Sequence, residues 1–184
     1  QTIKRTDFIR KKWLDNDFYG GVSTLYGKFN NLDLNFGVVA NQYKGKHYGN
    51  VTGVFFPQIF ESEYYRNNSV KNEFAGFAKF ILAKNRFEFF GDLQLRTIHY
   101  KTSIVTQGDF EGADLLFFNP KAGINYKIPA GKIFVSAAIA HREPNRDDLF
   151  ANPKTEAEKL YDFEAGLEKT LGIFSFTTNL YYMN

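Results

Sequence analysis

The segment REPNRDDL, residues 142–149, concentrates charged side chains that could do chemistry. Glu143 could form a general acid and base pair with Asp147 or Asp148, and the two arginines of the segment could hold an anionic substrate. No serine nucleophile motif, phosphate-binding glycine loop or His-Asp pair accompanies them. Pro144 removes a backbone donor and ends a strand. We therefore interpret the segment as a charged loop and expect no catalytic residue and no enzyme.

Metal chemistry is also weakly supported. His47, His99 and His141 are the only histidines, and no two of them have short metal-ligand spacing. All three fall near the loop end of the predicted strands, which leaves a shared site there open. The acidic run at 15–17 resembles the start of a calcium loop but lacks the glycine and the later glutamate. With no cysteine in the chain, we predict no metal site and no cofactor.

The composition points away from nucleic acid. The 184 residues carry 23 basic and 20 acidic side chains, a net charge of +3, and no basic stripe interleaved with stacking aromatics. Aromatic residues make up 18% of the chain, although its mean hydropathy is only −0.37.

No apolar run reaches the roughly 18 residues of a membrane helix. No signal peptide opens the chain, which begins at Gln1 in loop-like sequence, so we expect a processed or excised piece.

Period-two alternation is the strongest structural signal. In 87–99, apolar residues such as Phe87, Leu93 and Leu95 alternate with polar ones, which is typical of strands with one apolar and one polar face. The pattern predicts eight strands, at 21–29, 32–43, 71–83, 87–101, 117–128, 132–142, 160–169 and 173–183.

The connections between these strands alternate between short and long. Tight turns are predicted at 30–31, 84–86, 129–131 and 170–172, whereas 44–70, 102–116 and 143–159 are predicted as long loops. Thr155 and Glu158 have the spacing of a capping box, so a helical turn is expected there. Short turns at one end and long loops at the other are typical of an all-β, antiparallel, up-and-down transmembrane barrel.

Aromatic residues beside the tight turns fit the same architecture. They would form the girdle found where a barrel crosses the membrane interface, and they comprise Phe80, Phe87, Phe89, Phe174 and Phe176. A soluble barrel or sandwich is the alternative, because its strands also alternate and its aromatics fill a core.

Five segments resemble the TonB-dependent receptors of the outer membrane, in particular those of Bacteroidetes-like bacteria. They are RKKWLDNDFYGG (10–21), FFNPKAGINYKI (117–128), AHREPNRDDLF (140–150), EAEKLYDFEAGLE (156–168) and TTNLYYMN (177–184). The resemblance implies a barrel of about 22 strands with an N-terminal plug, which imports a scarce nutrient with energy transmitted by TonB.

The chain departs from that pattern, because we find no TonB box, no plug and only eight strands. We therefore expect residues 1–184 to be a portion of the barrel, with 1–20 an extracellular loop and 21–184 the strands, arranged as an open sheet that belongs to a larger barrel. The plug, and contact with TonB through it, would belong to the parent protein.

The resemblance implies a bacterial outer-membrane receptor surrounded by lipid. Its most common ligands are iron-siderophore complexes, with haem, cobalamin, glycans or peptides as alternatives. Loop residues that could contact an anionic or aromatic ligand are Tyr64, Tyr65, Arg66, Arg142 and Arg146. A soluble barrel that binds a small ligand is the second hypothesis, and a membrane hydrolase the third. The two arginines of REPNRDDL could equally pair with neighbouring strands.

Overall fold

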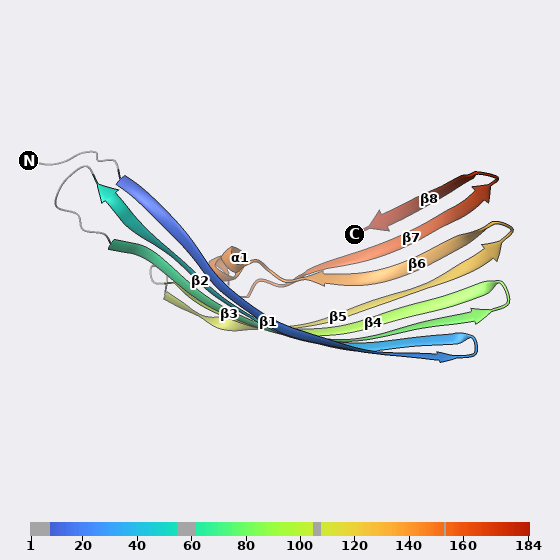
Figure 1. Ribbon diagram of the computed structural model, residues 1–184, viewed down its shortest axis with the longest axis horizontal. Helices are drawn as coiled ribbons and strands as arrows, with labels where there is room; N and C mark the ends of the chain where they lie inside the picture. Colours follow the sequence, from blue (N-terminus) through green and yellow to red (C-terminus); the bar gives the residue numbers. More distant parts are fainter. Residues whose placement is uncertain (1–7, 55–61, 105–107, 153) are drawn as a thin grey trace, which may run out of the picture. The chain divides into compact units, whose positions relative to one another are not determined.

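A computed structural model describes residues 8–54, 62–104, 108–152 and 154–184 of the chain. It contains eight strands and one short helix (Figure 1). The strands are β1 (Phe8–Phe29), β2 (Leu32–Val54), β3 (Ser62–Lys84), β4 (Phe87–Ile104), β5 (Gly108–Ile128), β6 (Gly131–Arg142), β7 (Glu158–Leu171) and β8 (Phe174–Met183), and the helix is α1 (Arg146–Ala151). No helix among the described residues has the length and apolar character needed to cross a membrane.

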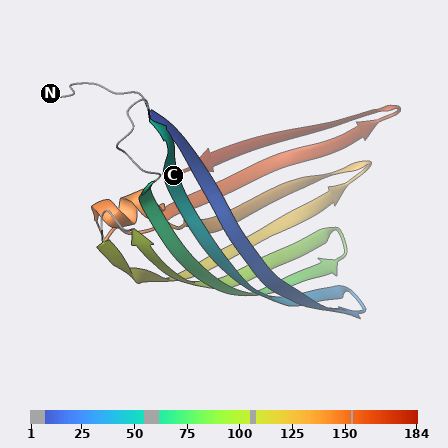
Figure 2. The ribbon, with the colours of Figure 1, turned by 60° about the vertical axis from the view of Figure 1, so that its left-hand side comes forward.

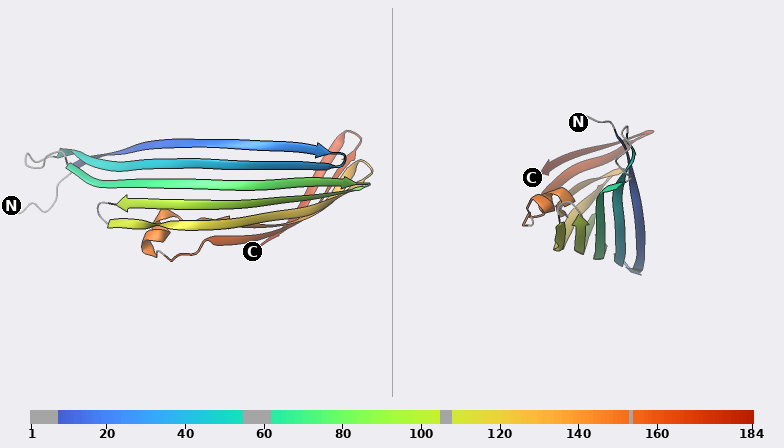
Figure 3. Two further views of the ribbon diagram at one scale, coloured as in Figure 1. Left: turned by 90° about the horizontal axis from the view of Figure 1, so that it is seen from below. Right: turned by 90° about the vertical axis from the view of Figure 1, so that its left-hand side faces the viewer.

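All eight strands form one sheet in which each strand pairs with the next along the chain, in the order β1 to β8. The neighbouring strands run side by side in Figure 3. The pairings β5–β6, β6–β7 and β7–β8 are antiparallel. The prediction of an all-β, up-and-down architecture with eight strands is therefore confirmed.

The chain forms two compact units. Unit 1 comprises 1–20, 41–73 and 98–114, and unit 2 comprises 21–40, 74–97 and 115–184. Strands β1 to β5 each contribute residues to both units, whereas β6, α1, β7 and β8 belong to unit 2.

The four tight turns lie in unit 2 along one end of the strands (Figure 2). Asn30 and Asn85 adopt φ angles of 51° and 55°, which asparagine tolerates better than most residues. Gly172 has a φ of 61° and begins the last turn, which occupies 172–173, slightly later than the predicted 170–172. Local turn chemistry therefore predicts these positions well.

Three of the predicted loop assignments are wrong in extent. The expected extracellular loop at 1–20 is strand β1 from Phe8 onwards, and most of the described residues of 44–70 and 102–116 belong to β2, β3, β4 and β5. Residues 1–7 lie outside the described residues. Strand pairing satisfies the backbone whatever the side chains are, so the strands continue where polar residues occupy both faces and the alternation disappears.

The two faces of the sheet in unit 2 differ in chemistry. Across β5, β6 and β7, Ile124, Val135 and Ala165 are direct neighbours on what we call the apolar face. The next row on the other side, which we call the polar face, contains Gly123, Ser136 and Glu164. Side chains alternate between these faces along each strand, as pleating requires.

The apolar face is the more exposed one. Val135 is 49% and Phe163 52% exposed, whereas Ser136 and Glu164 are half-buried. Among the described residues, the only buried hydrophobic side chains are Ala75, Ile98, Phe117 and Leu149. This is the reverse of a water-soluble fold, which rarely exposes a large continuous apolar surface.

Candidate functional site

Unit 1 contains two groups of aromatic and basic side chains on β1, β2 and β3, which together we call the aromatic-basic cluster. Trp13 stacks on Tyr48 with 5.5 Å between ring centroids and 9° between planes. The Arg66 guanidinium carbon lies 4.8 Å from the centroid of the Tyr48 ring. Neighbouring strands are spaced closely enough for such rows of side chains to touch. Tyr48 therefore joins an indole to a guanidinium by stacking and cation-π contact.

Glu63 orients the guanidinium of Arg66. Arg66 Nε donates to Glu63 Oε1 at 2.8 Å, and Arg66 Nη2 donates to Oε2 at 2.5 Å. This two-pronged hydrogen bond, together with the positive charge of Arg66, holds the pKa of the Glu63 carboxyl below its usual range. Because Arg66 is planar and held at two points, its position beside Tyr48 is fixed.

The tyrosines at 64 and 65 occupy space created by a glycine of β2. A side chain at Gly49 would collide with the Tyr65 ring and lie 2.8 Å from Tyr64 Cε1. The two tyrosine rings meet edge to face with 5.0 Å between centroids. Two cations of β1 approach them, with Arg10 Cζ 5.6 Å from the Tyr64 centroid and Lys12 Nζ 5.8 Å from the Tyr65 centroid.

The Tyr64 hydroxyl is buried and has no hydrogen-bond partner among the described residues. A buried hydroxyl without a partner is unfavourable, so it can accept a hydrogen bond from, or donate one to, a molecule that reaches it. The cluster combines aromatic faces, cations and this polar atom. Such a set suits a ligand that is anionic, aromatic or both.

Arg142 and Arg146 lie elsewhere, at the end of β6 and the start of α1 in unit 2. Arg142 pairs with Glu158 at 3.5 Å, and Arg146 with Asp147 at 3.1 Å. The five predicted ligand residues are therefore divided between the units, three in unit 1 and two in unit 2.

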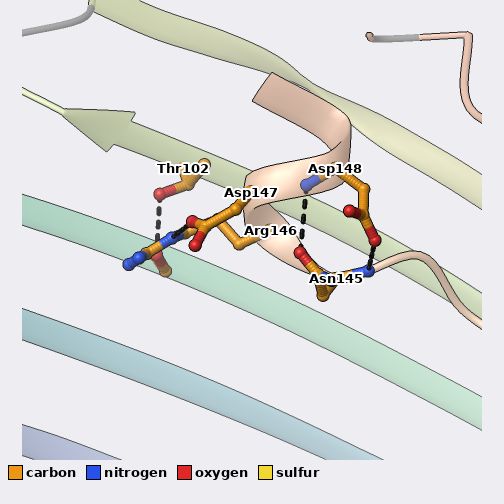
Figure 4. Close-up of polar contacts among 6 residues, drawn as sticks. Thr102, Asn145, Arg146, Asp147 and Asp148 are labelled. Atoms are coloured by element: carbon orange, nitrogen blue, oxygen red, sulfur yellow. Dashed lines mark hydrogen bonds and ion pairs between the residues drawn. The ribbon is translucent and has the colours of Figure 1, made fainter. Parts of the chain in front are cut away.

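The carboxylates of REPNRDDL have structural partners, and Figure 4 shows those of Asp147 and Asp148. Asn145 Oδ1 accepts from the Asp148 backbone N–H at 3.0 Å, and Asp148 Oδ2 accepts from the Asn145 N–H at 3.2 Å. This capping box starts α1. Glu143 pairs with Arg96 of β4 at 3.8 Å. The helical turn expected from Thr155 and Glu158 is thus wrong, because the helix begins earlier.

Substitution of Asn145 with alanine is expected to remove one half of this capping box and to lower the stability of α1 by about 1 kcal/mol. Hydrogen exchange of the α1 amides should become faster. Asp147→Ala is the matched control, because exposed Asp147 lies in the same turn and, among the described residues, pairs with Arg146 rather than with the cap. Equal exchange rates in the two variants would show that the cap does not stabilise α1.

The three histidines each have a different partner. His47 lies 3.2 Å from Asn16 Oδ1, and His99 Nδ1 contacts Asp114. His141 stacks on Phe117, and its Nδ1 lies 2.9 Å from Asn119 Oδ1. The part of the chain that the structure describes holds no group of three or more side chains suited to a metal.

Sequence reasoning missed four members of the aromatic-basic cluster: Arg10, Lys12, Trp13 and Tyr48. They lie in segments expected to be loops. Their role depends on the register of β1, β2 and β3, which the sequence does not display. Gly49 was the only local sign of these contacts in the sequence, because a glycine inside a strand often marks the close approach of another group.

A sheet of eight consecutive strands with an exposed apolar face defines a membrane β-barrel segment. The family model of the TonB dependent receptor-like β-barrel matches residues 2–184. The chain belongs to this family.

Solved structures share the fold. They include the copper transporter OprC (14% identity, TM-score 0.79, 94% of this chain and 30% of that chain). The ferric-catecholate import receptor Fiu from K12 E. coli, in its closed form, is similar at 16% identity and a TM-score of 0.72, over 92% of this chain and 31% of that chain. The ferric yersiniabactin uptake receptor FyuA from Yersinia pestis is similar at 11% identity and a TM-score of 0.62, over 97% and 31%.

The chain thus spans about a third of the length of these structures. A search of curated proteins finds no match.

Proposed function

We propose that the protein is an outer-membrane receptor and transporter for TonB-dependent uptake, with a ferric siderophore as its cargo. The observation that carries the membrane location is the exposed apolar face of unit 2, which includes Val135 and Phe163. Lipid would cover this face, and the polar face would line the interior. A soluble barrel that buries the same side chains would need them covered by protein.

The cargo class rests on the aromatic-basic cluster. Siderophore complexes are commonly anionic and often aromatic, which suits Arg66 beside Tyr48 and the cations beside Tyr64 and Tyr65. Arg142 and Arg146 are proposed as secondary contacts. Energy from TonB would act through the plug of the parent protein. Membrane receptor families of this kind are not enzymes, and the REPNRDDL carboxylates serve as a helix cap and ion pairs.

The location is tested by fractionation and by detergent dependence. We expect the protein in the outer-membrane fraction, and we expect it to precipitate when detergent is removed. A folded, monomeric protein in plain buffer would contradict the proposal.

Arg66→Ala tests the cargo site. It removes the cation above Tyr48 and leaves Glu63 without its partner, so affinity for a ferric siderophore should fall about tenfold or more. Tryptophan fluorescence quenching can report binding because Trp13 is the only tryptophan and belongs to the cluster. Lys46→Ala is the control, since Lys46 pairs with Asp15 nearby in unit 1. An unchanged affinity of Arg66→Ala would exclude the aromatic-basic cluster as the siderophore-binding site. Haem and cobalamin are the comparison ligands.

A further inference from the structure

The sheet of unit 2 is hollowed over β3. The hollow has a volume of about 510 Å³ and is lined by residues of β1 to β4, all of which belong to unit 2. Two small residues of β3, Gly76 and Ala78, form its floor, because β3 lies between β2 and β4 and both of those strands contribute larger side chains. The larger side chains form the walls of the hollow and comprise Phe36, Val38, Leu93 and Leu95.

The floor of the hollow belongs to the apolar face. The Phe90 ring of β4 covers Gly123, which is part of the polar face. Side chains alternate along a strand, so Gly91 belongs to the apolar face. The Phe80 ring of β3 covers Gly91, and Gly76 is four residues from Phe80, so Gly76 shares its face. The hollow is therefore continuous with the surface that we propose faces lipid.

Gly76 differs from the other strand glycines of this unit in having no cover. Phenylalanine rings lie over Gly37, Gly91, Gly123 and Gly166, and such rings restore the apolar contact that a glycine lacks. No atom of the described residues lies within 4 Å of a Cβ added at Gly76. Its place on the apolar face is thus open to another molecule.

The chemistry and width of the hollow select the kind of molecule that can enter. Among the lining residues Ser23 has the only polar side chain, and none is charged. Phe36 is 46% and Leu95 51% exposed, so the walls are apolar and accessible. Neighbouring strands lie about 4.8 Å apart, so the gap left above β3 is about one strand spacing wide. A helix, roughly 10 Å across, is too wide for this gap, whereas an extended hydrocarbon chain is not.

We propose that the hollow binds the end of one acyl chain of a membrane phospholipid. The inference rests on the membrane location proposed above. Leu93 lies six residues beyond Phe87, the first residue of β4. At about 3.3 Å per residue along a strand tilted by about 40°, it is about 15 Å from the turn, near the middle of an apolar band of roughly 25 Å. Chain ends, rather than head groups, reach this depth.

A phosphatidylcholine that carries a photoactivatable diazirine near the end of one acyl chain tests the site. The wild-type protein is reconstituted in vesicles of unlabelled phosphatidylcholine with a small fraction of this probe, and the labelled residues are located by mass spectrometry after irradiation. Val38 and Leu95 should be labelled about fourfold or more above Val135, the factor expected from one additional buried methylene. Val135 is the reference because it is 49% exposed on the same face outside the hollow.

Variants that fill the hollow should abolish this preference. Gly76→Leu and Ala78→Leu each place a large apolar side chain on the floor, and labelling of the walls should fall to that of Val135. Two independent variants keep the test valid if one of them fails to fold. Ala137→Leu is the matched control, because Ala137 is exposed on the apolar face of β6 outside the hollow, and it should keep the wild-type labelling.

Three outcomes would overturn the acyl-chain site. Equal labelling of Val135 and the walls would show that lipid covers the apolar face without a preferred position. Unchanged labelling in both filled variants would place the preference elsewhere. Walls protected from the probe in a protein that is dimeric in the vesicles would assign the hollow to a second copy. Each of these leaves the proposed function intact, whereas failure of the wild type to insert into membranes would remove both.

Discussion

Substitution of Gly166 with alanine is expected to prevent the protein from folding or to lower its free energy of unfolding by about 3 kcal/mol, the upper part of the range for overpacked sites. The added Cβ would collide with the Phe134 ring and lie 2.5 Å from the Thr178 carbonyl oxygen. Phe134 is the direct cross-strand neighbour of Gly166. Its ring covers the glycine, so the sheet has no room for a methyl group.

The same arrangement recurs across the sheet of unit 2. Phenylalanine rings cover glycines on neighbouring strands in four pairs: Gly37 with Phe77, Gly91 with Phe80, Gly123 with Phe90 and Gly166 with Phe134. A ring packed over a glycine restores the apolar contact that the missing side chain leaves open. The four pairs thus lock strand register as well as packing.

Folding of the Gly166 variant can be followed by the heat-modifiable gel migration of folded barrels and by urea unfolding in lipid. Gly76→Ala is the matched control, because nothing lies within 4 Å of a Cβ added there. That change should be neutral or slightly stabilising, since alanine in a strand is favoured over glycine by roughly 0.5–1 kcal/mol. A Gly166 variant as stable as the Gly76 variant would disprove the packing argument.

Rescue should differ between two of the sites. At Gly37, only ring atoms of Phe77 lie nearest to an added Cβ, so Phe77→Leu should restore part of the stability lost in Gly37→Ala. At Gly166, shortening Phe134 should not restore stability in the same way, because the Thr178 carbonyl oxygen would still collide with the added Cβ. Additive losses at Gly37 would indicate that the ring is not the cause.

The tight turns and the parts of the strands that lie in unit 2 could be predicted from the sequence because their causes are local. Asn30, Asn85 and Gly172 supply the turn backbone, and alternation marks the two faces. The remaining parts of β1 to β5 could not be predicted from the sequence. Pairing with a neighbouring strand keeps them extended, and their side chains show no regular pattern. The helical turn was misplaced because Thr155 and Glu158 match the usual capping-box residues, whereas the capping box of α1 uses Asn145 and Asp148.

Prediction of the candidate site was limited in the same way. Tyr64, Tyr65 and Arg66 stand together in the sequence and could be proposed as ligand contacts. Their partners Trp13 and Tyr48 come from other strands. Only the pairing of β1, β2 and β3 brings Trp13 and Tyr48 to Arg66, and this pairing depends on non-local contacts.

Substitution of Val135 with arginine is expected to destabilise the protein by about 2–4 kcal/mol, the cost of a cation near the middle of the lipid face of a barrel. Val135 is 49% exposed on the apolar face and lies four residues beyond Gly131, the first residue of β6. At about 3.3 Å per residue along a tilted strand, this places it near the centre of an apolar band of roughly 25 Å.

Ser136→Arg is the decisive control because Ser136 is adjacent in β6 but belongs to the polar face, where Glu164 is its direct neighbour. Arginine there gains an opposite charge, so its effect should be small. Urea unfolding in lipid vesicles measures both variants. If Val135 faced water, exposed arginine would be tolerated, typically within about 0.5 kcal/mol. A large loss for Val135→Arg together with a small one for Ser136→Arg would show that the apolar face is covered rather than exposed to water, and dependence on detergent would separate lipid from protein as the cover.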